Sequence, residues 1–267
     1  MKYSITTLCI GNKYTPILQH WLNRTTQKCK NAVITVFNDS NYINNIHVKN
    51  RSGLIWLLRF KQNIDYFKQN MIPLVMCDLD IIIEKDIEPL IQLPFDIIIS
   101  KEIGGTNAYP TDCSNILGFG VCAGFVIFKV TALSFMTTIL DNMINGKYNT
   151  CDDQVNIMKY IVNNKHSISN EIVKIYDKCY NNIIIDIDSI KICVLDFDII
   201  VRDPIMNIGQ VANHINIDNV GGSNNFIKYF YEDLEKLPLT CRCGKTHLGD
   251  NNKCIHIDLR NINKCVC

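Results

Sequence analysis

Two aspartates, one residue apart at the end of an apolar run, show the clearest potential for chemistry in this sequence. Apolar residues 75–77 lead into Asp78 and Asp80, and three isoleucines follow at 81–83. A buried strand that ends in two carboxylates offers oxygen ligands to a hard divalent cation such as Mg²⁺ or Mn²⁺, which keeps places for water and substrate phosphates. The pattern therefore predicts a metal site suited to a nucleoside diphosphate, although a solvated strand end would look the same.

Two later segments carry small or polar side chains that could contact a bound ligand. Ala123 and Gly124 stand before an apolar run, where small residues let the backbone approach a ligand or simply let strands pack. Asp153 and Gln154 begin a helical pattern that reaches residue 162. Asp152 or Asp153 would serve as the N-cap of this helix, so an acidic start is expected with or without a site.

The elements that must position these residues alternate between strands and helices. Buried strands are predicted at 4–10, 32–37, 96–100, 183–187 and 192–195, and helices at 15–28, 53–70 and 133–143. This alternation is typical of βαβ units with a ligand crevice beyond the carboxyl ends of the strands. The helix at 53–70 places Lys61 beside its inward face, where it could reach a phosphate or stay solvated, and we give Arg59 less weight. The polar segment 104–115 is long enough to form a mobile lid.

Composition excludes several classes of protein. The chain has 267 residues, 47% of them hydrophobic and 20% charged, which suits one α/β domain with a full core. Its 27 basic and 26 acidic residues leave a net charge of +1, so no global field draws it to nucleic acid or to an anionic membrane. No apolar run reaches the ~18 residues of a membrane span, and a signal-peptide pattern is lacking, so we expect a cytoplasmic protein.

Taken in order, these motifs resemble those of the nucleotide-diphospho-sugar glycosyltransferases of the GT-A fold, over roughly residues 3–232. The resemblance is strongest to the retaining branches, which pair an Asp-Gln motif with a late segment of histidine, glycine and lysine. The residues that carry it are Asp78, Asp80, Cys122, Ala123, Gly124, Asp153, Gln154, His214, Asn216, Gly221, Gly222 and Lys228. It implies an α/β fold with a mixed, mainly parallel, Rossmann-like sheet flanked by helices.

The resemblance also implies a role for each matched position. Asp78, Asp80 and His214 would hold Mn²⁺ or Mg²⁺ against the diphosphate of a nucleotide-sugar donor, expected to be a UDP-sugar. The other donor-binding positions would be Thr7 and Tyr14 near the nucleobase, Lys61, Gly221 or Gly222, and Lys228 at the phosphates, and Ala123 and Gly124 near the sugar. Cys122 stands where the retaining families commonly place Asn or Ser, which leaves the identity of the sugar open.

Asp153 and Gln154 are the predicted catalytic residues. Breaking the bond between an anomeric carbon and a nucleoside diphosphate places negative charge on the leaving phosphate, which a metal and a lysine offset. Positive charge develops on the sugar ring, and a nearby carboxylate or amide oxygen stabilises it. The resemblance implies retention at the anomeric carbon, while the acceptor, whether a glycan, a protein or a small molecule, is not identified by any motif.

Residues 238–267 are predicted to form a cysteine- and histidine-rich tail after a transferase domain at 1–237. The seven candidate metal donors of this tail are Cys241, Cys243, His247, Cys254, His256, Cys265 and Cys267. Their density is compatible with a structural Zn²⁺. The spacing is Cys-x-Cys rather than the Cys-x-x-Cys of common zinc sites, so redox chemistry or chance clustering stays open.

Two other classes of function fit part of the pattern. A haloacid-dehalogenase-like phosphatase also begins with an apolar strand and Asp-x-Asp, with Asp78 as the nucleophile, although that motif normally lies on the first strand. A non-catalytic module would keep the nucleotide-sugar-binding fold and use the tail to recruit a partner. Sugar transfer, phosphate release from phosphomonoesters, or neither would separate the three hypotheses.

Overall fold

Alternating apolar strands and helices in the first third of the chain build a parallel unit. The computed structural model describes residues 1–11, 14–38, 53–202, 211–217, 222–227, 231, 239–240 and 246–247. Strand β1 (Tyr3–Leu8) pairs in parallel with β2 (Ala32–Phe37) and with β3 (Leu74–Cys77). Helices α1 (Thr15–Lys28) and α2 (Leu54–Asn70) make the crossovers, as the predicted βαβ alternation requires.

The rest of the chain extends this unit into an eight-stranded sheet with the order β2-β1-β3-β6-β5-β9-β8-β7. The added strands are β5 (Ile97–Glu102), β6 (Gly120–Phe128), β7 (Ser167–Ile175), β8 (Lys178–Ile187) and β9 (Ile190–Val194). The predicted mixed α/β sheet is therefore confirmed. It is less parallel than expected, because β6 runs antiparallel between β3 and β5, and β7, β8 and β9 follow one another through antiparallel hairpins.

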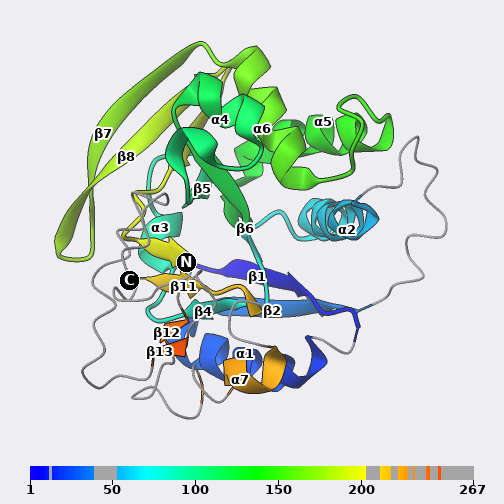
Figure 1. The fold of residues 1–267 in the computed structure, drawn as a ribbon, viewed down its shortest axis with the longest axis vertical. Helices are drawn as coiled ribbons and strands as arrows, with labels where there is room; N and C mark the ends of the chain where they lie inside the picture. The colour runs from blue at the N-terminus through cyan, green and yellow to red at the C-terminus, as the bar shows by residue number, and fades with distance from the viewer. Residues whose placement is uncertain are drawn as a thin grey trace.

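Helices cover both faces of the sheet, and each face has its own core (Figure 1). On one face α2 packs with α4 (Thr111–Leu117), α5 (Leu133–Ile144) and α6 (Asp153–Asn164). On the other face lie α1 and α7 (Ser223–Ile227). Alternate residues of β3 divide between the two cores, since Leu74 faces α2 while Val75 faces α1. The central strands are thereby packed on both faces of the sheet, which fixes the position of their ends.

A second, small sheet lies beyond the end of β3. It consists of β10 (Ile200–Arg202), β11 (Ala212–His214) and β4 (Ile81–Ile83), in that order, with β11 antiparallel to β4. The buried indole of Trp21 in α1 donates a hydrogen bond of 3.1 Å to the carbonyl of Ile81. Short helix α3 (Glu88–Ile91) follows β4. The small sheet is thus anchored to the α1 face of the main sheet.

The segment that the sequence suggested as a mobile lid is helical, and that prediction was wrong. It forms a 3₁₀ turn, η2 (Gly105–Asn107), and the helix α4. Buried Ser114 donates to the carbonyls of Thr106 at 2.7 Å and Ala108 at 2.6 Å, which ties the turn to the helix. Such hydroxyl-to-carbonyl hydrogen bonds satisfy backbone carbonyls that would have no partner in an open loop. A further 3₁₀ turn, η3 (Val130–Ala132), leads into α5.

Most of the predicted tail lies outside the described residues. Within it, the structure describes only the backbone pairing of β12 (Leu239–Thr240) with β13 (Thr246–His247). The predicted boundary at residue 237 and the predicted zinc ligands therefore stay predictions.

Candidate metal centre

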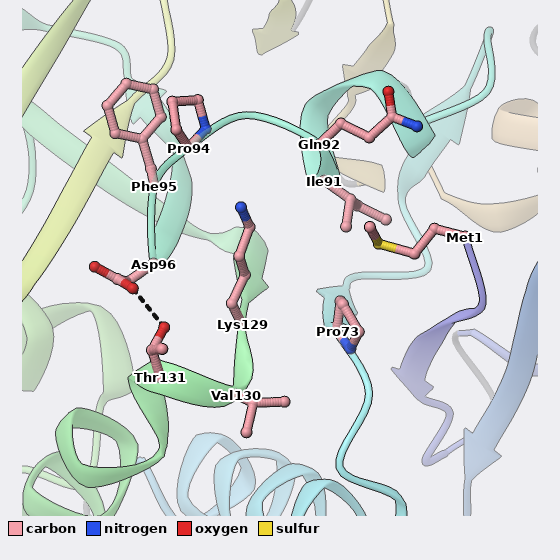
Figure 2. A pocket seen from close by; sticks show the side chains of 10 residues that line it. All are labelled: Met1, Pro73, Ile91, Gln92, Pro94, Phe95, Asp96, Lys129, Val130 and Thr131. Carbon is pink, nitrogen blue, oxygen red and sulfur yellow. Dashed lines mark hydrogen bonds between the residues drawn. The ribbon is translucent and has the colours of Figure 1, made fainter.

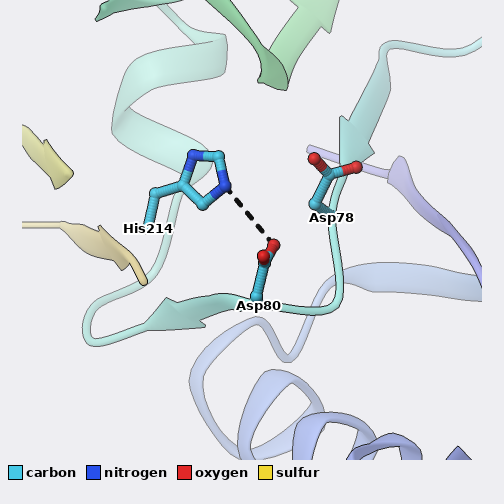
Figure 3. A group of neighbouring side chains, drawn as sticks. All are labelled: Asp78, Asp80 and His214. Atoms are coloured by element: carbon cyan, nitrogen blue, oxygen red, sulfur yellow. Dashed lines mark ion pairs between the residues drawn. The ribbon is translucent and has the colours of Figure 1, made fainter. Parts of the chain in front are cut away.

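Three of the predicted metal ligands come together at the end of β3. One ligand atom each from Asp78, Asp80 and His214 lies within 4.8 Å of the others. Figure 3 shows the two carboxylates and the imidazole pointing toward one another, with His214 Nε2 3.4 Å from Asp80 Oδ1. A ring nitrogen and two carboxylate oxygens form a donor set that suits a divalent cation such as Mn²⁺.

Backbone pairing, not sequence proximity, brings the histidine to the aspartates. In the register of β11 with β4, His214 lies opposite Ile81, the residue that follows Asp80. The amide of Ile215 donates to the carbonyl of Asp80 at 2.9 Å and continues this pairing. The amide of Ile81 donates to the carbonyl of Asp78 at 3.1 Å, which closes a turn between the two carboxylates. The three side chains therefore converge without a long flexible connection.

A β-bulge in β6 places the backbone of Gly124 against the same cluster. Ile99 of β5 lies opposite Val126, but the next residue, Ser100, lies opposite Cys122. Residues 123–125 of β6 therefore have no opposite residue in β5. On the other side, the carbonyl of Gly124 accepts a 2.8 Å hydrogen bond from the amide of Asp78. Bulges of this kind are common beside active sites, because they redirect the chain locally.

Only glycine fits at position 124. A Cβ atom there would lie 2.6 Å from Cε1 of His214 and 2.9 Å from Oδ2 of Asp78. Both distances are shorter than real carbon contacts allow, so any side chain would displace two of the candidate ligands. The small residue that the sequence placed near the sugar therefore also shapes the metal cluster.

Arg59, to which the sequence analysis gave little weight, is the buried cation of the site. Its guanidinium forms ion pairs with both Asp78 and Asp153, and its Nε lies 3.1 Å from Oδ2 of Asp153. Arg59 is only 5% exposed and Asp153 only 1%. One side chain thus joins α2, the end of β3 and the first turn of α6. Arg59 has apolar neighbours on α2, and the helical periodicity of the sequence alone did not show that its side chain is buried.

Burial and neighbouring charges shift the protonation of this network. Burial raises the pKa of Asp153 to about 6, although Arg59 opposes the rise. The pKa of Asp78 is raised as well, since burial and the charge of Asp80 outweigh Arg59. Burial would lower the pKa of His214, but Cys122 and Asp80 raise it well above its usual value. Histidine binds a metal only as the neutral imidazole, so a cation between these groups would take the place of that proton.

Asp152, Asp153 and Gln154 divide three tasks at the start of α6. Asp152 is the N-cap, because its carboxylate accepts a 3.0 Å hydrogen bond from the amide of Val155. Asp153 instead pairs with Arg59. The Gln154 side chain accepts a 3.2 Å hydrogen bond from the Ala123 amide, at the bulge in β6. Its Nε2 donates to the carbonyl of Tyr109 at 2.8 Å. Gln154 therefore connects α6 to both the bulge and the turn before α4.

The other predicted donor-binding residues lie in varied settings. Thr7 is buried in β1, where no hydrogen-bond partner of its hydroxyl is found in the described part of the chain. Tyr14 precedes α1 and packs against the core on that face. Lys61 forms a 2.7 Å ion pair with Asp65 one turn along α2. Gly222 precedes α7 with a positive φ of 104°. Gly221 and Lys228 fall outside the described residues.

A separate open pocket of ≈ 400 Å³ lies away from this cluster (Figure 2). It is lined by the segments that precede β3 and β5, including Pro73 and Asp96, and by Lys129 just after β6. Because β6 is antiparallel to β3, these residues mark the edge of the sheet opposite to Asp78. None of the candidate metal ligands lines this pocket.

Comparison with known proteins finds similarity in structure rather than in sequence. No family model and no curated protein matches the chain. A glycosyltransferase involved in glycosylation of the major capsid of PBCV-1 is 12% identical, with a TM-score of 0.42, over 60% of this chain and 76% of that one. Mouse xyloside xylosyltransferase 1, in its apo form, is 12% identical, with a TM-score of 0.45, over 76% of this chain and 88% of that one.

A third similar structure is the glycosyltransferase GlyE of Streptococcus pneumoniae TIGR4. It is 11% identical with a TM-score of 0.41, and the match covers 60% of this chain but only 43% of GlyE. Similarity of this degree does not establish a shared activity. Within the described residues, none of the helices combines the length and the apolar character needed to cross a membrane.

Replacing Gly124 with alanine should weaken metal binding by about 10- to 100-fold, because the added methyl displaces His214 and Asp78. Calorimetric titration with Mn²⁺ measures the change. Gly120→Ala, on the same strand as Gly124, is the matched control. Its Cβ would lie 2.4 Å from Cβ of Ala108, away from the candidate ligands. Equal loss of Mn²⁺ affinity in both variants would show that strand distortion, not the cluster, is responsible.

Replacing Arg59 with methionine should lower the free energy of unfolding by about 3–5 kcal/mol, because two carboxylates then lose their buried partner. Lys61→Met removes a cation two residues along the same helix, and its partly exposed pair with Asp65 should contribute about 1 kcal/mol or less. Urea denaturation of the two variants in metal-free buffer gives the comparison. A difference of less than about 1 kcal/mol between them would contradict the assignment.

Proposed function

We propose that this protein is a metal-dependent glycosyltransferase that moves a sugar from a nucleoside-diphosphate sugar, taken to be a UDP-sugar, to an acceptor not yet identified. The observation that carries the proposal is the convergence of Asp78, Asp80 and His214 at the carboxyl end of β3, against the glycine bulge of β6. Ligands of open α/β sheets bind at this end of the strands. The paired carboxylates and the imidazole suit a divalent cation with a diphosphate.

The residues of the chain suggest how such a site would work. Asp78, Asp80 and His214 would hold the cation, which offsets the charge of the leaving diphosphate when bound. Arg59 orients Asp78 and adds a second positive charge at the cluster. Because Arg59 is almost fully buried and bonded on both sides, we assign it to positioning the two carboxylates, and its charge opposes the rise that burial causes in their pKa values.

The predicted catalytic pair divides into two proposed roles. Asp153 is buried against Arg59, so we assign it to holding the guanidinium in place. Gln154 is bonded to the Ala123 amide beside Gly124, and we propose that it lies near the anomeric carbon of the donor. An amide oxygen in that position would stabilise the positive charge that develops on the sugar ring.

Affinity for UDP should depend on Mn²⁺ and should fall about 10- to 100-fold in Asp80→Asn and in His214→Ala, since each change removes a ligand. Calorimetry with and without chelator measures it. Asp188→Asn, an acid-to-amide change at the exposed His166 pair between β8 and β9, is the matched control and should bind UDP normally. Binding that is indifferent to chelator, or to both ligand substitutions, would sink the proposal.

Incubation with Mn²⁺ and a panel of nucleotide sugars should release nucleoside diphosphate slowly even without an acceptor, because water can take the sugar. Proton NMR of the first sugar product should show the anomeric configuration of the donor, as the retaining resemblance implies. An inverted product would exclude retention while leaving the transferase proposal intact. Release of phosphate from phosphomonoesters instead would favour the phosphatase, and absence of any turnover would favour a binding module.

A further inference from the structure

Strand β7 leaves one edge of the main sheet without a partner strand in the described part of the chain. It is the last strand in the sheet order and pairs with β8 along all nine of its residues, with no shift in register. Figure 1 shows β7 and β8 as a long ribbon at the side of the molecule, beyond the helices. The first six residues of β7 are exposed, so a row of backbone donors and acceptors faces outward.

This edge lacks the usual protection against pairing. Soluble proteins normally blunt such an edge with proline, a bulge or several charges. β7 contains neither a proline nor a bulge, and it presents Ile168, which is 41% exposed, and Ile172, which is 73% exposed. The two isoleucines are four residues apart and therefore share a face of the strand. No large apolar side chain in the described residues is more exposed than Ile172.

The opposite face of β7 is anchored to the body of the protein. Ile175 belongs to the core on the α1 side, and Val173 packs against that core. On β8, Tyr180 lies opposite Val173 and is buried in the same cluster. β7 is therefore held as an extended strand, and a second strand could pair along the edge that no described strand occupies.

The sequence of β7 is complementary to itself in one register. A twofold axis perpendicular to the sheet pairs two copies antiparallel and sets residues of the same face opposite each other. Centring on Glu171 would oppose two glutamates, which is unfavourable. Centring on Val173 would oppose Ile172 to Lys174. Centring on Ile172 opposes Ile172 to its own copy but leaves Ile168 outside the paired strands. Centring on Asn170 sets Ile168 of each copy against Ile172 of the other, and the two Asn170 amides can donate to and accept from each other.

We propose that two copies of this chain associate through antiparallel pairing of their β7 strands, with Asn170 on the twofold axis, so that two sheets become one. The contact involves one strand of each copy, and small interfaces, below about 1,200 Å², are typical of weak association. The dimer therefore forms and dissociates with concentration. The inference does not depend on the proposed transferase activity, because β7 lies four strands from β6 and its bulge.

Sedimentation velocity in reducing buffer, at concentrations up to about 0.2 mM, tests the proposal in the range where weak dimers populate. The expected mass rises from that of the 30.6 kDa chain toward twice that value. Ile172→Asp should raise the dissociation constant at least about tenfold, because it sets a carboxylate of each copy against the apolar side chain of Ile168 of the other. Ile116→Asp on α4, where the isoleucine is 63% exposed, is the matched control and should associate normally.

Cross-linking tests the register in a Cys179→Ser background, which removes the exposed thiol of the hairpin and, without a new cysteine, serves as the control for disulfides of the tail cysteines. Opposite residues of an antiparallel pair have Cβ atoms about 4.5–5.5 Å apart, so Asn170→Cys should form a disulfide-linked dimer on mild oxidation. Glu171→Cys should not, since its two copies are offset in this register. A chain that stays at 30.6 kDa throughout, a dimer unaffected by Ile172→Asp, or preferential cross-linking of Glu171→Cys would overturn the proposal.

Discussion

The buried guanidinium of Arg59 is the interaction on which the rest of the site depends. It binds Asp78 at the end of β3 and Asp153 at the start of α6, and it comes from α2. Asp153, which is 1% exposed, depends on this cation for its charge, because an unpaired buried charge costs several kcal/mol. Asp153 and Asp78 raise the pKa of Arg59 further above its ordinary value, although burial alone would lower it. The positive charge is therefore permanent.

Space beside this network is limited by a second constraint, the β-bulge of β6. The bulge brings Gly124 so close to His214 and Asp78 that no Cβ fits. Ser100 closes its base by donating to the carbonyls of Cys122 at 3.0 Å and Phe125 at 3.4 Å. The amide of Ala123, released from the ladder, is taken by Gln154. One irregularity in a central strand thus links the candidate metal cluster to α6.

Much of this architecture could be predicted from short-range pattern. Apolar runs located β1, β2, β3 and β9 within one or two residues, and the Asp-x-Asp pair supplied two of the three side chains that converge in the candidate cluster. It was harder to predict which basic side chain of α2 enters the site. Arg59 and Lys61 lie two residues apart on α2, and only the rotation of the packed helix decides which one turns inward. An apolar helix face more than 100° wide does not resolve that choice.

The sequence by itself determined the βαβ beginning, the chemistry of the carboxylate pair and the acidic start of α6, because each of these depends on neighbours within a few residues. Tertiary structure decided which acid caps the helix and which meets Arg59. It also decided that β6 runs antiparallel and that His214 lies beside Asp80, through the register of β11 with β4. Packing and hydrogen bonding between segments far apart in the chain determine which strands pair, and local sequence periodicity contains no information about this pairing.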